Sequence, residues 1–244
     1  CKYYALKQQY IYYVTSLADT NRKGTSRYGI TQCNNTGFNV SGFFVIRFSV
    51  LGKIILQSDL PDIKVPIYFK GSNQREPYNA FLNGGQYNIE IGLNNYSGLN
   101  IKADYCTIKG FNILGSQDNG INIYNSNTRI EGCNINNNNG NGIYIAATSS
   151  SNIIGTNHGL DSNHISNIIT QNLLNGIEID GSNHNIIRKN YIGTIDGTNP
   201  ASNQQNGIYI THGAKNNIIG GRAFKNSNGD VNNPTGSYLK TTPV

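Results

Sequence analysis

A five-residue phrase recurs along the second half of the chain and constrains the fold more than any other feature. It consists of a polar residue, a glycine, an aliphatic residue, a variable residue and a second aliphatic residue. Successive glycines of the phrase are 22, 22, 34 and 31 residues apart. A period in the low twenties, lengthened by insertions, is typical of a solenoid, and the alternation within each phrase is typical of a strand. The phrase occurs as Ser97-Gly98-Leu99-Asn100-Ile101, Asn119-Gly120-Ile121-Asn122-Ile123, Asn141-Gly142-Ile143-Tyr144-Ile145, Asn175-Gly176-Ile177-Glu178-Ile179 and Asn206-Gly207-Ile208-Tyr209-Ile210.

The composition favours a folded, β-rich chain with polar, uncharged loops. Only 13% of the 244 residues are charged, and there are 28 glycines, whereas disordered chains usually carry more charge and fewer β-branched residues. The net charge of +6 is concentrated in residues 1–97, which hold 10 Lys and Arg against 5 Asp and Glu. This bias suits an acidic glycan partner, although an ordinary solvated surface is the better explanation. Without clustering it does not indicate nucleic-acid binding, and no apolar run approaches the roughly 18–20 residues of a transmembrane segment.

The four cysteines, Cys1, Cys33, Cys106 and Cys133, show no zinc-like spacing and do not predict a disulfide framework. We expect Cys106 and Cys133 to be buried as small apolar residues. The chain lacks an initiating Met, which predicts a removed signal segment or a fragment. An N-terminal Cys would also suit a processed bacterial lipoprotein.

Short apolar segments separated by single turns predict strands with no room for crossover helices. Parallel strands connected in this way require a coiled solenoid. Thr25-Ser26 can cap a short helix that continues to Cys33. In the regular coils a second strand is expected after each phrase. The expected strands before the phrases are 11–15, 43–48, 53–56 and 65–69, and those after them are 107–113, 129–135 and 187–192.

Stacking coils at about 4.8 Å places equivalent residues of the phrase in columns. Lys109 should lie directly over Glu131 as a surface ion pair, which is worth at most a few tenths of a kcal/mol. The asparagines should form a structural ladder, because Asn tolerates left-handed backbone geometry and stacked amides can hydrogen-bond from coil to coil. The following glycine should permit an otherwise strained bend. The expected buried columns are Ile101, Ile123, Ile145, Ile179 and Ile210, and Leu99, Ile121, Ile143, Ile177 and Ile208, and the expected ladder is Asn119, Asn141, Asn175 and Asn206.

Several further motifs carry a family likeness that extends from about residue 11 to about residue 224. They are Ser151-Asn152-Ile153-Ile154-Gly155, Asn163-His164-Ile165-Ser166, Arg188-Lys189-Asn190-Tyr191-Ile192-Gly193-Thr194 with Asp196-Gly197-Thr198, and Gly213-Ala214-Lys215-Asn216-Asn217-Ile218-Ile219-Gly220-Gly221, preceded by Gly24-Thr25-Ser26-Arg27 and Leu60-Pro61-Asp62-Ile63. This succession resembles the large family of secreted right-handed parallel β-helix repeat proteins in the pectate-lyase-like superfamily.

The resemblance implies one all-β domain, a right-handed parallel β-helix with a short N-terminal capping helix. Residues 1–97 would form the cap and first coils, residues 98–224 the regular coils with two loop insertions, and residues 225–244 an irregular tail. Many members of the family are surface or extracellular proteins without known activity, while characterised relatives in the superfamily cut or bind polysaccharides. After Phe224 no capping element is evident, so we expect either a longer natural chain or a partner over that end.

If the aliphatic residues point inward, the variable position and the residue after the last Ile are free to specify function. Glu178 and Asp180 then face outward on one strand, with Tyr144 and Tyr209 on the adjacent coils and Tyr124 nearby. Two carboxylates between aromatic rings are the arrangement of a glycoside hydrolase, and one would need a raised pKa to act as acid. Alternatively, the carboxylates are solvated surface groups and the tyrosines simply contact sugars.

A lyase of this superfamily would instead use a Ca²⁺ cluster with a basic residue. Asp161, Glu178, Asp180 and Asp196 could supply oxygen ligands, and Arg188 or Lys189 the base, but no acid-rich binding loop is present. The histidines (His158, His164, His184 and His212) lack metal-ligand spacing and are interpreted as loop residues. We therefore expect no tightly bound cofactor.

Two function hypotheses follow from the sequence. The first is a non-catalytic, extracellular or surface-exposed β-helix protein, with a structural or adhesive role, that contacts glycans or belongs to a larger assembly such as a cell surface, an appendage or a virion. The second is a polysaccharide lyase or glycoside hydrolase that uses the face bearing Glu178 and Asp180. A groove of clustered acids with Arg or Lys would favour the second hypothesis.

Overall fold

The computed structural model describes residues 8–36, 42–71, 89–155, 166–220 and 238–239. These residues form mostly β structure, with three parallel sheets and one short helix. Sheet A consists, in spatial order, of β1 (Gln8–Val14), β2 (Gly42–Phe48), β4 (Ile67–Lys70), β7 (Thr107–Lys109), β10 (Arg129–Glu131), β13 (Ile153–Gly155), β16 (Ile186–Arg188) and β19 (Ile218–Ile219). Sheet B consists of β3 (Gly52–Ile55), β5 (Ile89–Gly92), β8 (Phe111–Leu114), β11 (Asn134–Asn136), β14 (Asn167–Thr170), β17 (Asn190–Ile192) and β20 (Tyr238–Leu239). Sheet C consists of β6 (Leu99–Ile101), β9 (Ile121–Ile123), β12 (Ile143–Ile145), β15 (Ile177–Asp180) and β18 (Ile208–Thr211).

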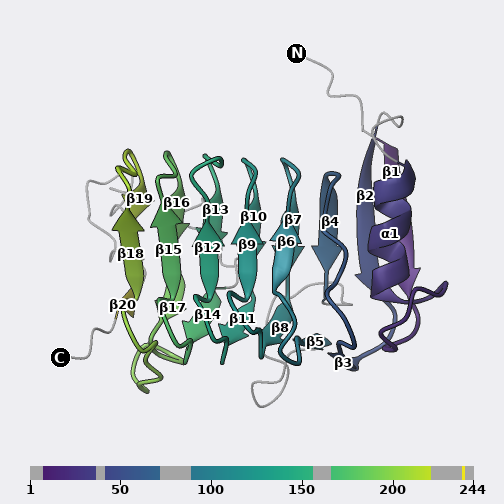
Figure 1. Ribbon diagram of the computed structural model, residues 1–244, viewed down its shortest axis with the longest axis horizontal. Coiled ribbons are helices and arrows are strands. Elements are labelled where there is room, and N and C mark those ends of the chain that lie inside the picture. Colours follow the sequence, from purple (N-terminus) through teal and green to yellow (C-terminus); the bar gives the residue numbers. More distant parts are fainter. Residues whose placement is uncertain (1–7, 37–41, 72–88, 156–165, 221–237, 240–244) are drawn as a thin grey trace, which may run out of the picture.

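From β6 onward the chain visits sheet C, sheet A and sheet B in a repeating order. Each strand pairs in parallel with the equivalent strand of the next coil, as Ile123 does with Ile145 and Ile130 with Ile154. Figure 1 shows the resulting row of strands side by side along the long axis. β20, which lies in the segment expected to be an irregular tail, continues the order by pairing with β17. The arrangement is consistent with a parallel β-helix.

The prediction of a single strand after each phrase is wrong, because each of these segments forms two strands that belong to two different sheets. β7 and β8 are separated by Gly110, which has φ 78°. Gly132 and Lys189, with φ 57° and 51°, occupy the equivalent turns of later coils. One left-handed residue bends the chain from sheet A into sheet B, and glycine adopts this conformation without a steric cost. The alternation of apolar residues is interrupted at the bend, because Ile108 is followed by Phe111 three residues later and Ile130 by Cys133, and this interruption is the sequence signal of the bend.

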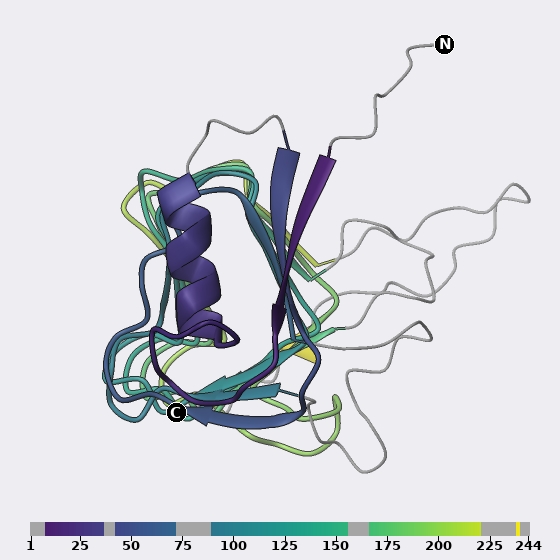
Figure 2. The ribbon, with the colours of Figure 1, turned by 90° about the vertical axis from the view of Figure 1, so that its right-hand side faces the viewer.

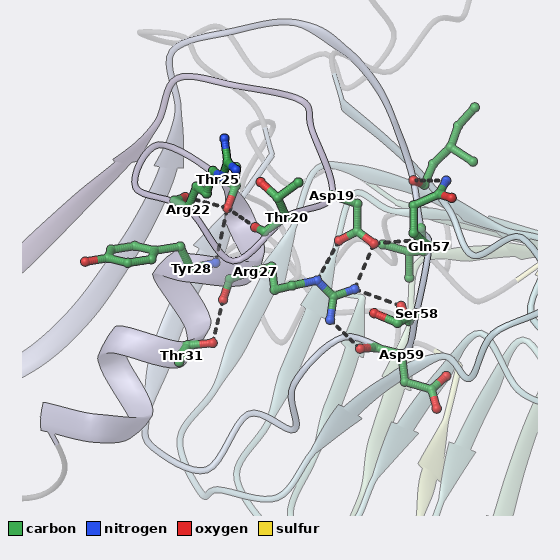
Figure 3. Close-up of polar contacts among 12 residues, drawn as sticks. Asp19, Thr20, Arg22, Thr25, Arg27, Tyr28, Thr31, Gln57, Ser58 and Asp59 are labelled. Atoms are coloured by element: carbon green, nitrogen blue, oxygen red, sulfur yellow. Dashed lines mark hydrogen bonds and ion pairs between the residues drawn. The ribbon is translucent and has the colours of Figure 1, made fainter.

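The expected helix is present as α1 (Ser26–Thr36), with Ile30 and Cys33 buried. Thr25 caps it, because its Oγ1 accepts the backbone N–H of Tyr28 at 3.3 Å. Figures 1 and 2 show α1 lying across the end of the stack beside β1 and β2. Arg27 fastens the helix through two 2.8 Å hydrogen bonds to the buried carboxylate of Asp19 (Figure 3).

The two predicted aliphatic columns form the core, except at their last members. Their residues from Leu99 to Ile179 are at most 2% exposed, whereas Ile210 is 44% exposed. Three rings, those of Phe48, Phe69 and Phe111, pack together in the first coils with centroids 4.6–5.8 Å apart. The columns therefore reach the last described coil, where Ile210 is largely exposed.

The predicted asparagine ladder is confirmed, and of the two predicted reasons for it only hydrogen bonding from coil to coil holds. Asn141, Asn175 and Asn206 each donate a side-chain N–H to the amide oxygen of the preceding rung, at 2.8–3.0 Å. None of the four asparagines has a positive φ, so left-handed geometry does not select them. Hydrogen bonding alone accounts for the ladder. Three further ladders, which the sequence analysis missed, join Asn138, Asn172 and Asn203, then Asn152, Asn185 and Asn217, then Asn167 and Asn190.

The glycines of the phrase are required because the neighbouring coil leaves no room for a side chain. The prediction that they permit a strained bend is wrong. Gly120, Gly142 and Gly176 do not have a positive φ. A Cβ on Gly142 would lie 2.6 Å from Cγ2 of Ile169 and 2.7 Å from the carbonyl oxygen of Gly176. The coils approach so closely here that only a hydrogen atom fits.

Lys109 and Glu131 form the predicted pair, with 3.4 Å between Nζ and Oε2. The pair is not on the surface, because the two side chains are only 14% and 9% exposed, and Arg129 also contacts Glu131 at 2.9 Å. Cys33, Cys106 and Cys133 are free and buried, while Cys1 lies outside the described residues. Within the described ranges no helix is both long and apolar enough to cross a membrane.

Candidate glycan-contact face

The outer face of sheet C carries the residues that the sequence analysis selected. Glu178 and Asp180 are partly exposed and alternate with the fully buried Ile177 and Ile179. Strand register places Glu178 between Tyr144 on β12 and Tyr209 on β18. The prediction of an outward row with these neighbours is confirmed. The whole row consists of Asn100, Asn122, Tyr144, Glu178 and Tyr209.

Asp180 has a hydrogen-bond partner on each carboxylate oxygen. The hydroxyl of Tyr144 donates to Oδ2 at 2.5 Å, and Nδ1 of His212 lies 2.6 Å from Oδ1. The bond from Tyr144 is the main reason that the pKa of Asp180 is lowered. Burial and the neighbouring carboxylate raise the pKa of Tyr144 well above its usual value. Asp180 therefore stays ionised and Tyr144 stays protonated over the whole physiological pH range.

Glu178 is held by the asparagine ladder. Nδ2 of Asn141 donates to its Oε2 at 2.7 Å, while the same amide group donates to Asn119 on the preceding coil. The ladder that stabilises the stack thus also orients a carboxylate on its surface. Sequence reasoning gave these asparagines a structural role only, and the side-chain geometry adds this second one.

The three tyrosines do not share one environment. Tyr144 is bonded to Asp180, whereas Tyr209 is 44% exposed at the last coil. Tyr124 lies under the ammonium group of Lys102, which is 5.6 Å from its ring centroid. Lys102 also pairs with Asp62 at 2.9 Å, and this bond raises its pKa. A sugar could stack on the exposed ring of Tyr209 directly, while the hydroxyl of Tyr144 and the ring face of Tyr124 are already engaged in the free protein.

His212 was interpreted only as a loop residue, and the structure brings it to this face. It follows Thr211, which is the register partner of Asp180 on the next coil. It has φ 48°, and its side chain is 76% exposed. With Nδ1 held by Asp180, Nε2 is the ring nitrogen left for another partner. His212 is one residue beyond the register partner of the carboxylate Asp180, and this position in the sequence is the signal that could have identified it.

The acidic residues proposed for Ca²⁺ are only partly described and serve separate roles. Asp161 lies outside the described residues, as do His158 and His164. Asp196 accepts hydrogen bonds from Thr198 and Asn199 within its own turn, which lower its pKa. Among the residues with assigned positions, no three His, Cys, Asp or Glu side chains converge to hold a metal ion. Of the two basic candidates, Arg188 donates to the carbonyl of Gly220 at 3.0 Å.

Comparison with known proteins adds no assignment. No protein-family model matches the chain. A search of the curated proteins also finds no significant relative. The resemblance to pectate-lyase-like β-helix proteins and the division at residues 97 and 224 stay predictions, and function has to be argued from the geometry of sheet C.

Proposed function

We propose that the chain is a right-handed parallel β-helix of the pectate-lyase-like type whose sheet C face contacts glycans without cleaving them. The protein would be secreted or surface-exposed, with a structural or adhesive role in a larger assembly such as a cell surface, an appendage or a virion. The repeating order of the three parallel sheets supports the solenoid. The strong preference for right-handed connections between parallel strands supports the hand.

The hydrogen bonds that already occupy both Asp180 and Glu178 are the observation that supports the non-catalytic assignment. A glycosidase pair needs one carboxyl group that is protonated near neutral pH. The lowered pKa of Asp180 excludes it from that role. Glu178 would then have to be the acid, but its Oε2 already accepts the Nδ2–H of Asn141 at 2.7 Å, so this oxygen does not carry the proton that an acid donates.

The same features suit recognition of sugars. The oxygens of Glu178 and Asp180 are fixed acceptors for sugar hydroxyl groups, and the exposed ring of Tyr209 can stack on the apolar face of a pyranose. Because hydrogen bonds already hold the carboxylates, little side-chain entropy is lost on binding. A rigid polar row with one exposed aromatic ring favours binding over turnover.

A glycan array, followed by calorimetry on each hit, tests this proposal. Tyr209→Ala should weaken binding about 3- to 10-fold, from the usual contribution of an aromatic contact. Tyr13→Ala is the matched control, because Tyr13 is similarly exposed (52%) but lies on sheet A. Equal weakening by both variants, or no glycan bound at all, would contradict the proposal.

One observation favours the polysaccharide lyase or glycoside hydrolase as a second candidate. Asp180 holds His212 by Nδ1, and a histidine oriented in this way can accept a proton at Nε2. Each bound glycan should therefore be incubated with the protein and assayed for new reducing ends and for unsaturated products. Cleavage that is lost in Asp180→Asn and in His212→Gln would establish the enzyme and overturn the non-catalytic assignment.

A further inference from the structure

The two carboxylates of sheet C leave much of their hydrogen-bonding capacity for a ligand. An ionised carboxylate has about four acceptor sites and no donor. Glu178 accepts one hydrogen bond, from the side-chain amide of Asn141, and Asp180 accepts one on each oxygen, from Tyr144 and His212. No described residue donates to Oε1 of Glu178. This part of the face therefore offers acceptors, and a ligand that pairs with it has to supply the donors.

The same two carboxylates are not neutralised by a basic side chain. Glu178 and Asp180 each contribute one formal negative charge, and the lowered pKa of Asp180 keeps that group charged. In the part of the chain that the structure describes, no Lys or Arg forms an ion pair with either of them. His212 bonds to Asp180 but adds a positive charge only when it is protonated. A ligand at this position meets a negative surface.

The lysines of sheet C lie on its first coils. Ile63 pairs with Ile101, and this bridge brings Lys64 and Lys102, the residues that follow them, to neighbouring coils. Lys102 is already paired with Asp62 at 2.9 Å. It follows β6, which is three strands from β15 in the order of sheet C, and stacked coils put this separation at about 14 Å. Because the Debye length at physiological salt is about 8 Å, these lysines do not screen the carboxylates.

Part of the basic bias that suited an acidic glycan lies on another sheet. Arg47 and Lys70 are register partners on sheet A, and Lys70 is in turn the partner of Lys109. An acidic sugar on sheet C would be placed against Glu178 and Asp180, and like charges brought together lower affinity. The charge of sheet C therefore disfavours the acidic class of glycan.

We propose that the glycan bound by sheet C carries free amino groups and that one ammonium group is held between Glu178 and Asp180. This inference rests on the glycan-contact role proposed above and names the class of sugar. The two residues are two apart on β15, so their Cα atoms are about 6–7 Å apart, a separation that one ammonium group can bridge. An ammonium group supplies three donors, and its hydrogen bonds to carboxylates are roughly twice as strong as neutral ones. An N-acetylated amine has one donor and no charge, so it satisfies the pair poorly.

Calorimetry with three oligosaccharides of equal length tests the inference. They are oligomers of glucosamine, of N-acetylglucosamine and of galacturonic acid, compared at one pH at which the amino groups are protonated. The glucosamine oligomer should bind at least about 10-fold more tightly than its N-acetylated counterpart, and the galacturonic acid oligomer should bind most weakly. Added salt should reduce the preference for the amino sugar, because it screens exposed charges.

Two variants assign the preference to the carboxylate pair. Glu178→Gln removes one charge at nearly constant size and should weaken binding of the glucosamine oligomer at least about 10-fold. Glu90→Gln is the matched control, because it removes the same charge from sheet B, where Glu90 pairs with Lys53. Circular dichroism of both variants checks that the fold is retained. Equal weakening by both variants would reveal a general effect of net charge and overturn the inference.

The outcomes separate this inference from the glycan-contact role. Equal affinity for the glucosamine and N-acetylglucosamine oligomers, or a preference for the galacturonic acid oligomer, would refute the amino-sugar assignment and leave glycan contact standing. If neither these oligomers nor any glycan on the array binds, both proposals are wrong.

Discussion

Asn172→Ala is the sharpest test of the buried ladder formed by Asn138, Asn172 and Asn203. The structure shows this ladder, whereas the repeated phrase did not predict it. Asn172 is fully buried, and its Oδ1 accepts the backbone N–H and the Nδ2–H of Asn138 at 3.2 and 2.9 Å. The alanine leaves these two buried donors without an acceptor. Each buried donor that loses its partner costs about 1–3 kcal/mol, so the free energy of unfolding should fall by about 2–6 kcal/mol.

The control is Asn206→Ala, at the last described rung of another ladder. Asn206 is exposed, and its side chain makes one described hydrogen bond, to Asn175 at 2.8 Å. Its removal should cost at most about 1 kcal/mol. Urea unfolding followed by far-ultraviolet circular dichroism measures both variants against the wild type, with tyrosine fluorescence as a second probe. A loss below about 1 kcal/mol for Asn172→Ala, or equal losses for both variants, would refute the reasoning.

Three other predictions concern packing, charge and the buried thiol. Gly142→Ala should lower stability by about 1–3 kcal/mol in the same assay, because its Cβ meets three atoms within 2.9 Å. The loss should exceed that of Gly92→Ala, where φ is not positive and the nearest atom, Cε of the flexible Lys53 side chain, is 3.1 Å away. Tyr144→Phe should move the pKa of Asp180 up toward about 3.9, as read by carboxylate NMR titration, since the Tyr144 hydroxyl is the largest cause of its depression. The lowered pKa means that the stability contributed by Asp180 is present above its unfolded pKa and is lost as the pH falls through the folded one. In Tyr144→Phe this loss, followed by acid unfolding, should be smaller and shifted to higher pH, and an unshifted titration would contradict the assignment. Burial raises the pKa of Cys133 to about 12, so iodoacetamide should modify it only in urea, and mass spectrometry of the native protein should show it unmodified.

The repeat phrase was enough to predict the sheet C strands and their register. Its two aliphatic positions became the buried columns, and its variable position became the outward row with Tyr144, Glu178 and Tyr209. These results follow because a strand alternates its side chains and a stack repeats them. The helix at residues 26–36 was predictable for a similar, local reason, since Thr25 is a capping residue.

The second half of each coil was not predictable in the same way. The alternation breaks at Gly110 and Gly132, where successive apolar residues are three apart, but such a break also fits a bulge within one strand and does not by itself identify a bend between two sheets. The buried ladders around Asn172 and Asn185 were missed because an isolated Asn in a turn has the same local signature whether it is buried or solvated. Only the neighbouring coil reveals that the amide oxygen accepts two donors.

The sequence by itself determined that this protein stacks β-strands with its isoleucines inside, because the spacing of the phrase leaves few other ways to bury them. Only the tertiary structure decided what the outward residues do. It joined Tyr144, Asp180 and His212 from three coils, and fixed Glu178 on Asn141. The pKa of a carboxylate and the accessibility of a ring depend on neighbours more than twenty residues away in the chain, which no local pattern encodes. The same physical reason explains why Ile210, identical in pattern to Ile179, is exposed, since no described strand follows its own in sheet C.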